Sequence, residues 1–299
     1  MVKHLPLLFS PHNHPLMQAL CAKLPAEQGK LLIRRFPDGE SYLKIDTDVR
    51  QRQCLVLADL SNPDGKFLPL MFLAATLKEL GARSVGLVAP YLSYMRQDIR
   101  FHEGEAVTSK IFASLISEKF DWLVTVDPHL HRYHSLDEIY SIPGRVVQGA
   151  PVLAEWLAGV ENVLLVGPDA ESEQWVSKIA ALGEHPFVVG EKTRHGDRNV
   201  SITLPDISSF TGTTAVIIDD VISSGHTVLE CLGALQQAGI TTVDCACVHG
   251  IFTDGIDEVL REKGIRKLVS CNTVAHPSNA LDVSALLVTP INEFLEEAD

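Results

Sequence analysis

The chain has 299 residues, a length that suits two domains of ordinary size, each with its own hydrophobic core. Its formal net charge of −13 argues against nucleic acid as a main partner, because binding a phosphate backbone needs a cationic surface. No apolar run reaches the roughly 18 residues of a membrane-spanning helix, so we expect no membrane partner. The six scattered cysteines and an N-terminus without a secretion signal favour a cytoplasmic protein.

Strand-like and helix-like segments alternate along the chain. Apolar, β-branched runs predict strands at residues 31–35, 54–58, 84–89, 122–126, 163–166, 185–189, 215–218, 242–249 and 267–270. Helical patterns predict helices at residues 15–23, 69–80, 108–119, 150–158, 171–182, 227–238, 255–263 and 284–297, the last interrupted by Pro290. This alternation predicts an α/β fold built from right-handed βαβ units, with mostly parallel, Rossmann-like sheets.

A weak internal repeat relates the two halves of the chain. Residues 54–91 and 215–249 each contain a strand, an acidic turn, a helix, a glycine and a second strand. The repeat predicts two similar α/β domains, residues 1–147 and 148–299, with the boundary shortly after Gly144. In such sheets ligands bind at the carboxyl ends of the strands, where the polar clusters described next also fall.

The most informative stretch follows the predicted strand at 215–218. Asp219 and Asp220 end this strand, and a small loop then leads into a helix through Ser223, Ser224, Gly225, His226 and Thr227. Such a loop offers backbone N–H groups and hydroxyls to a phosphate. The carboxylates would repel a phosphate, but they can accept hydrogen bonds from sugar hydroxyls, directly or through a divalent cation. The stretch predicts a site for a phosphorylated sugar; the alternative is an ordinary strand–turn–helix corner with a capping hydroxyl.

A second polar segment, residues 35–41, follows the predicted strand at 31–35. Phe36 can stack on a flat ring, while Asp38 and Glu40 can accept hydrogen bonds from ring nitrogens. The alternative interpretation is a simple Pro-Asp-Gly turn, which is a common sequence.

Two further clusters follow strands in the first half of the chain. After the strand at 84–89, Arg96, Arg100 and His102 can contact a polyphosphate or can belong to a solvated loop. After the strand at 122–126, histidines at positions 129, 131 and 134 can ligate a cation, although isolated histidines are usually structural.

Two clusters also stand out in the second half. Asp169 lies between a strand and a helix, where it can hold a metal ion or a sugar hydroxyl. Residues 190–199 are glycine-bounded and rich in cations, which is unusual in a chain this acidic. We interpret them as a lid that brings Lys192 and Arg194 to a transferring phosphate. The alternative is a solvated hairpin loop.

Taken together, these clusters resemble the ribose-phosphate diphosphokinase family over nearly the whole chain. The resemblance rests on Phe-Pro-Asp-Gly-Glu at 36–40, Pro-Tyr-x-x-Tyr-x-Arg-Gln-Asp at 90–98, Thr-Val-Asp-x-His at 125–129 and Pro-Asp-Ala at 168–170. It also includes Lys-x-Arg at 192–194, the Asp-Asp loop and His-Gly-Ile-Phe at 249–252, all in the family's order. The Asp-Asp loop alone is shared with phosphoribosyltransferases, whereas the full set is far more specific.

The resemblance implies a role for each cluster. It implies adenine contacts from Phe36, Asp38 and Glu40 across a subunit interface, and further ATP contacts from Arg96, Gln97 and His102. It implies Mg²⁺ at His129 and Asp169, and stabilisation of the transition state by Lys192 and Arg194. It implies that ribose 5-phosphate binds Asp219, Asp220, Ser223, Ser224, Gly225, His226 and Thr227. A site shared between subunits implies a homo-oligomer, a dimer or larger.

The reaction that the family carries out also follows from the resemblance. The anomeric hydroxyl of ribose 5-phosphate attacks the β-phosphorus of Mg-ATP, which yields 5-phosphoribosyl 1-diphosphate for nucleotide biosynthesis and releases AMP. Phosphoryl-type transfer mainly needs alignment and charge neutralisation, so cations on a closing loop together with Mg²⁺ would suffice without a protein nucleophile.

The chain departs from the family pattern in two loops. Glu171 and Ser172 stand where the family usually has two glycines after Pro-Asp-Ala, and residues 223–227 replace the usual Asp-Thr-x-Gly-Thr. Two other functions compete with the kinase. A phosphoribosyltransferase would not need the segments at 36–40 and 96–98. A nucleotide-sensing homologue without catalysis should have lost Lys192, Arg194 or His129, and all three are present.

Overall fold

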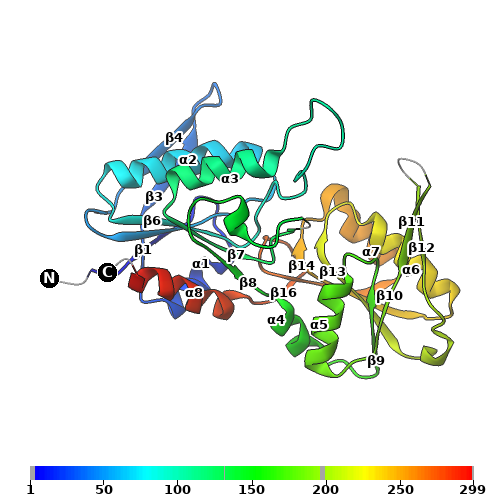
Figure 1. The fold of residues 1–299 in the computed structure, drawn as a ribbon. Helices are drawn as coiled ribbons and strands as arrows, with labels where there is room; N and C mark the ends of the chain where they lie inside the picture. Colours follow the sequence, from blue (N-terminus) through cyan, green and yellow to red (C-terminus); the bar gives the residue numbers. More distant parts are fainter. Residues whose placement is uncertain (1–3, 131, 196–198, 298–299) are drawn as a thin grey trace. The chain divides into compact units, whose positions relative to one another are not determined.

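A computed structural model describes residues 4–130, 132–195 and 199–297, without the side chains of residues 194, 195, 199 and 200 (Figure 1). The chain divides into two compact units. Unit 1 runs to Gln148 and resumes at Ser284, and unit 2 comprises Gly149–Val283. Within the described residues, no helix has both the length and the apolar character needed to cross a bilayer.

Unit 1 is a six-stranded parallel sheet with the order β2-β1-β5-β6-β7-β8. The strands are β1 (Leu7–Phe9), β2 (Glu27–Gln28), β5 (Gln53–Leu57), β6 (Ser84–Ala89), β7 (Trp122–Val126) and β8 (Gly144–Val147). The helices are α1 (Leu16–Lys23), α2 (Asp64–Glu79), α3 (Thr108–Lys119) and α8 (Ser284–Glu297), with a 3₁₀ turn at Leu136–Glu138. Helices α2 and α3 cover one face and α1 and α8 the other, so the central strands β5 and β7 are buried throughout (Figure 1).

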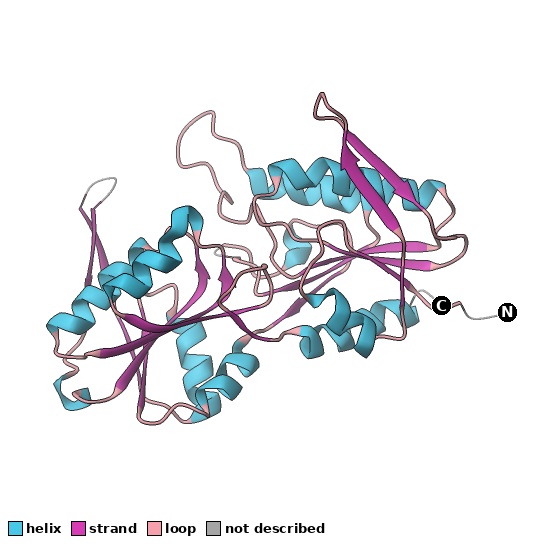
Figure 2. Ribbon diagram, turned by 180° about the vertical axis from the view of Figure 1, so that it is seen from behind, coloured by secondary structure: helices cyan, strands magenta, loops and turns pink. Residues whose placement is uncertain are grey.

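Unit 2 repeats this plan with the order β10-β9-β13-β14-β15-β16, again with parallel neighbours. The strands are β9 (Val163–Gly167), β10 (Phe187–Val189), β13 (Thr214–Ile222), β14 (Thr242–Gly250), β15 (Ile265–Cys271) and β16 (Asn279–Leu281). The helices are α4 (Ala150–Leu157), α5 (Glu173–Gly183), α6 (His226–Gln237) and α7 (Ile256–Lys263), with 3₁₀ turns at Ser208–Phe210 and Thr253–Gly255. Figure 2 shows helices on both sides of the strands in each unit.

Each unit also carries an antiparallel hairpin at the same place in its chain order. In unit 1 it is formed by β3 (Leu31–Arg35) and β4 (Ser41–Ile45), between β2 and β5. In unit 2 it is formed by β11 (Glu191–His195) and β12 (Asn199–Thr203), between β10 and β13. The prediction of two similar, mostly parallel α/β units is therefore confirmed, while the predicted strand at 31–35 belongs to a hairpin outside the main sheet.

The last helix departs from the predicted domain division. The sequence placed residues 148–299 in one domain, but α8 belongs to unit 1. Phe294 of α8 stacks on Trp122 with ring centroids 4.8 Å apart, and the backbone carbonyl of Leu295 accepts a hydrogen bond from Gln53 Nε2 at 2.8 Å. These contacts bury the apolar face of α8 on the first sheet, so the chain returns to the unit where it began. Pro290 lies inside α8 and does not end it.

Candidate active site

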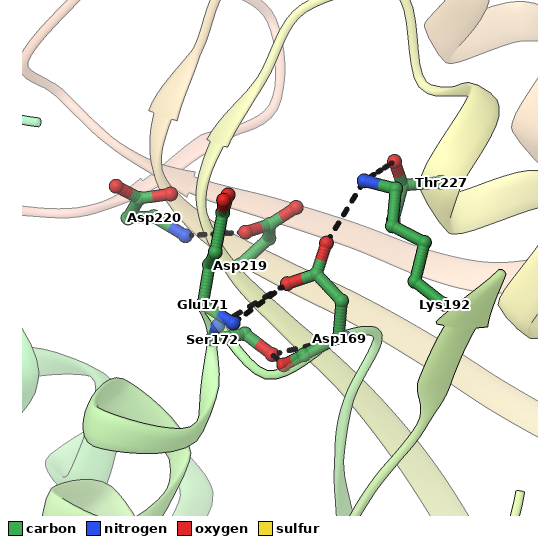
Figure 3. Close-up of polar contacts among 7 residues, drawn as sticks. All are labelled: Asp169, Glu171, Ser172, Lys192, Asp219, Asp220 and Thr227. Carbon is green, nitrogen blue, oxygen red and sulfur yellow. Dashed lines mark hydrogen bonds and ion pairs between the residues drawn. The ribbon is translucent and has the colours of Figure 1, made fainter. Parts of the chain in front are cut away.

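The carboxyl ends of β9 and β13 form the centre of the candidate site in unit 2. The chain runs from β9 outward to β10 on one side and from β13 to β14 on the other, so these neighbouring strands mark the point where the order reverses. Ligands of open α/β sheets bind at such a point. Asp169 follows β9, and Asp219 and Asp220 lie on β13 (Figure 3).

Strand β13 is longer than the sequence predicted. Its pairing with β9 stops at Ile217, but its pairing with β14 continues to Ile222. Asp219 and Asp220 therefore stand on a strand end that extends beyond β9, rather than in a loop. This rigid support fixes the backbone of both carboxylates before any ligand binds.

Three carboxylates lie close together at the carboxyl ends of β9 and β13. Asp220 is buried and Asp219 half-buried, and the Asp220 N–H donates to Asp219 Oδ1 at 3.0 Å. Burial, together with the charges of Asp220 and Asp169, raises the pKa of Asp219 well above its ordinary value. The arrangement favours a bound proton, cation or hydroxyl donor at this position.

Lys192 is the cation that reaches this cluster. Its Nζ lies 2.9 Å from Asp169 Oδ2 and 3.4 Å from Thr227 Oγ1, and it comes from β11 of the hairpin (Figure 3). The sequence prediction that this segment delivers Lys192 to the site agrees with this position. The side chain of Arg194 lies outside the described part of the chain.

Glu171 and Ser172, which depart from the family pattern, build the turn that holds Asp169. Asp169 Oδ1 accepts hydrogen bonds from the backbone N–H groups of Glu171 at 3.2 Å and Ser172 at 3.3 Å. The buried Ser172 hydroxyl donates to the Asp169 carbonyl at 2.5 Å. A side chain at Gly167 would overlap that hydroxyl. Sequence reasoning missed this role of Ser172, although a serine just before a helix is a recognisable capping signal.

The loop at 223–227 is short and leads directly into α6, which begins at His226. Gly225 has a left-handed backbone with φ of 67°, and a side chain there would overlap Ile256. Ser224 and His226 are exposed, while Ser223 and Thr227 are half-buried. The first backbone N–H groups of α6 have no partner one turn earlier in the helix, so this end of α6 suits an anion.

In unit 1, the predicted adenine residues lie at the tip of the β3–β4 hairpin. Phe36 is 38% exposed, and the Arg34 guanidinium lies 4.7 Å from its ring centroid. Asp38 Oδ1 accepts the Glu40 N–H at 3.1 Å, which closes the turn, and both carboxylates are exposed. The segment is thus a Pro-Asp-Gly turn that leaves an aromatic face and two acceptors accessible.

The predicted ATP residues of unit 1 lie in the long loop between β6 and α3. Arg96 and His102 are exposed and Gln97 is half-buried. The loop is anchored by the neighbouring Asp98, whose carboxylate is fully buried and accepts Arg132 Nη1 at 2.7 and 3.0 Å. Sequence reasoning missed this ion pair, because the two residues are 34 positions apart and neither carries a local motif for the other.

The predicted metal ligands fall in different units. His129 is half-buried after β7 in unit 1, whereas Asp169 belongs to unit 2. Position 131 lies outside the described residues. Among the residues that are described, no three His, Cys, Asp or Glu side chains are grouped to hold a metal ion.

The fold of unit 2, with its acidic strand end and hydroxyl-rich loop, defines a phosphoribosyltransferase-type domain. A family model of the phosphoribosyl transferase domain matches residues 135–285, and a model of the N-terminal domain of ribose phosphate pyrophosphokinase matches residues 6–119. The chain belongs to the ribose-phosphate pyrophosphokinase family, so the resemblance noted in the sequence is confirmed and the chain is an enzyme, a transferase.

Individual relatives agree with this assignment. The chain is 30% identical to a ribose-phosphate pyrophosphokinase of Methanobrevibacter smithii over 273 residues, which cover 87% of this chain and 91% of that protein. It is 28% identical to ribose-phosphate pyrophosphokinase 1 of Streptococcus pyogenes, covering 90% and 85% of the two chains. The crystal structure of phosphoribosylpyrophosphate synthetase from Mycobacterium smegmatis superposes with a TM-score of 0.85 at 23% identity, covering 98% of this chain and 100% of that one, which supports the fold.

Proposed function

We propose that this enzyme transfers the diphosphoryl group of Mg-ATP to the anomeric hydroxyl of ribose 5-phosphate, giving 5-phosphoribosyl 1-diphosphate and AMP in the cytoplasm. The observation that carries the proposal is the convergence at one sheet edge of Asp169, Asp219, Asp220, Lys192 and the loop at 223–227 (Figure 3). One such site offers acceptors for sugar hydroxyls, donors for a phosphate and a cation for the transferring group.

The two ends of the sugar phosphate would bind different kinds of groups, hydrogen-bond donors at one end and carboxylates at the other. The 5-phosphate would lie on the N-terminus of α6, where the hydroxyls of Ser223 and Thr227 add donors to the backbone N–H groups. Asp219 and Asp220 would accept hydrogen bonds from the ribose hydroxyls.

The carboxylates also fit Mg²⁺. The raised pKa of Asp219 follows from burial and from the charges of Asp220 and Asp169, and Lys192 pairs with Asp169. Mg²⁺ binds one or two protein carboxylates, keeps several waters and takes its remaining ligands from substrate phosphates, so a site without three convergent protein ligands suits it. We propose that Asp169 and Asp219 would hold the ion, which would supply charge neutralisation, and the role of His129 in unit 1 as a metal ligand stays a prediction.

Lys192 would stabilise the transferring diphosphoryl group. Its ammonium lies beside Thr227, at the end of the proposed phosphate loop, and its pairing with Asp169 keeps it there without substrate. The transferring diphosphoryl group would offer Lys192 a more highly charged partner than a carboxylate already shared with backbone N–H groups. Arg194, two residues further along β11, would act on the same group.

The adenine would stack on the exposed Phe36 ring, with Asp38 and Glu40 accepting hydrogen bonds from its nitrogens, and Arg96, Gln97 and His102 would contact the rest of ATP. Because these hairpin residues stand at the tip of a projecting element, we propose that they serve a neighbouring copy, which makes the enzyme at least a dimer.

The test is AMP release from Mg-ATP with and without ribose 5-phosphate, with the sugar product identified by mass. Formation of AMP that depends on ribose 5-phosphate, together with a diphosphorylated pentose, is the expected result. ADP as product would indicate transfer of the γ-phosphate and overturn the proposal. ATP binding without turnover would favour the nucleotide-sensing alternative.

A further inference from the structure

The loop at 223–227 rests on a second segment, residues 250–256, which has no predicted contact with substrate. The Ile222 carbonyl accepts the N–H groups of Ile251 at 2.9 Å and Phe252 at 3.1 Å. The Ser223 carbonyl accepts the Thr253 N–H at 3.0 Å. These hydrogen bonds and the close approach of Gly225 to Ile256 support the loop on the side of residues 250–256.

This supporting segment has an unusual backbone. Phe252, Asp254 and Gly255 all have positive φ, of 44°, 58° and 72°. A left-handed conformation is rare and unfavourable for an aromatic residue, so it persists only where the surroundings enforce it. Phe252 cannot relax without moving the N–H group that it donates to Ile222.

His276 packs directly against Phe252. The two rings are tilted by 42°, with centroids 4.5 Å apart. The His276 ring is itself fixed, because Nδ1 lies 2.8 Å from Ser278 Oγ and accepts the Ser278 N–H at 3.2 Å, while Nε2 faces Asp257 at 3.6 Å. Ser278 and Asp257 thus fix the ring that packs against Phe252.

We propose that Phe252 and His276 are positioning residues for the sugar phosphate, acting through the backbone of the 223–227 loop. This inference rests on the proposed role of that loop in binding ribose 5-phosphate. If the stack is lost, Phe252 can leave the left-handed region, the Thr253 and Phe252 N–H groups move, and the loop loses its fixed geometry. Binding of ribose 5-phosphate then weakens, while the ATP residues of unit 1 are untouched.

The experiment compares steady-state kinetics of the full-length wild-type enzyme with His276→Ala, His276→Gln and His276→Phe. The Ala and Gln variants remove the ring. We expect the KM for ribose 5-phosphate to rise about tenfold, because the loss of one aromatic pair corresponds to about that factor in affinity. The KM for ATP should stay unchanged. His276→Phe keeps a ring but loses the Ser278 and Asp257 contacts, and it should restore most of the affinity for ribose 5-phosphate.

Phe252→Leu serves as a second probe, since it removes the stack from the other side with little change in apolar volume. Unchanged KM for ribose 5-phosphate in the Ala, Gln and Leu variants would overturn the inference. So would an equal loss in all parameters that tracks the fraction of folded protein by circular dichroism, because a merely structural role predicts that pattern. Failure of the wild-type enzyme to use ribose 5-phosphate would instead overturn the proposed function.

Discussion

The two units carry the same sheet, but the charge at its carboxyl edge differs between them. In unit 1, Asp59 follows β5 and accepts Lys66 Nζ and Ser61 Oγ, each at 2.6 Å. Burial acts to raise the pKa of Asp59, but the hydrogen bonds from Lys66 and Ser61 outweigh it and lower that pKa. In unit 2, the equivalent strand β13 carries two carboxylates beside Asp169. Asp59 is thus paired within its own strand–helix corner, whereas Asp219 is crowded by Asp220 and Asp169.

The lysines of the two edges also differ in origin. Lys66 lies in the first turn of α2, seven residues from Asp59, so this ion pair forms as soon as the local structure does. Lys192 lies on a hairpin 23 residues from Asp169. A lysine on a separate hairpin can exchange a carboxylate for a phosphate, whereas a lysine within the same strand–helix corner cannot move away. We propose that the duplicated fold serves ATP binding in unit 1 and sugar-phosphate binding and catalysis in unit 2.

The largest effect should come from removing the hairpin lysine. Lys192→Ala should lower the turnover number for AMP formation by about 10²–10³-fold, the usual effect of losing one preorganised donor to the transition state. The KM for ATP should change little. Lys66→Ala is the matched control, because it removes the equivalent lysine of the other edge, and it should keep full turnover. Equal turnover in both variants would contradict the assignment of chemistry to unit 2.

The two hairpins should likewise affect different substrates. Phe36→Ala removes the exposed ring at the tip of β3–β4, and we expect the KM for ATP to rise about 10- to 100-fold, since stacking of a base on an aromatic ring contributes about 1–3 kcal/mol. The KM for ribose 5-phosphate should stay constant. Leu32→Ala, at another exposed position of this hairpin, is the control. A change in ribose 5-phosphate affinity, or equal effects of both variants, would refute the adenine assignment.

Much of this contrast could be predicted from the sequence, because it depends on local patterns. The internal repeat indicated two similar units, and the position of Asp219, Asp220 and Lys192 followed from strand ends and a cationic segment. The assignment of α8 to unit 1 could not be predicted. The stacking of Phe294 on Trp122 joins residues far apart in the chain, and an apolar helix face does not specify which core it covers.

The dependence on tertiary packing also explains why the sequence did not predict which carboxylates form ion pairs. Asp59 occupies the position of Asp220 in the repeat, yet its pairing depends on Lys66 turning back toward the strand end. The pairing of Asp98 with Arg132 is also a tertiary contact. Sequence patterns locate acidic residues, but only the packed structure shows which carboxylates have found a cation.

Repulsion between Asp219 and the neighbouring carboxylates of unit 2 should lower the free energy of unfolding in the absence of ligands. The pKa of Asp219 is raised above its ordinary 3.8 by burial, Asp220 and Asp169. Its contribution to stability is therefore full below that value and is lost as the pH rises through the folded-state pKa. Asp219→Asn stays uncharged, and at neutral pH its Tm should be about 2–4 °C higher, the shift for about 1 kcal/mol in a unit of this size.

Calorimetric melting across pH, with and without Mg²⁺, checks this prediction. Mg²⁺ should raise the Tm of the wild-type enzyme more than that of Asp219→Asn, because a bound cation relieves the same repulsion. Activity should fall in the variant despite its higher Tm. Identical profiles of Tm against pH for the two proteins would show that ionisation of Asp219 does not affect stability.

The smallest effect concerns the neutralised edge of unit 1. His12 lies close to this ion pair, and its pKa is lowered from 6.5 by burial and by Lys66, while Asp59 opposes the shift. Because the folded-state pKa is lowered, His12 contributes stability that is present above 6.5 and is lost as the pH falls through the folded-state pKa.

Lys66→Met removes one cause of the shift and exposes His12 to an unpaired Asp59 carboxylate, so the pKa of His12 should rise. The titration of its ring protons by NMR, assigned with His12→Gln, measures this directly. The variant should also lose about 1–2 kcal/mol of stability at neutral pH, since it leaves a partly buried carboxylate without its cation, yet AMP formation per folded enzyme should not change. An unshifted His12 titration would mean that the charge of Lys66 is not felt at this edge, and the contrast between the two units would then rest on unit 2 alone.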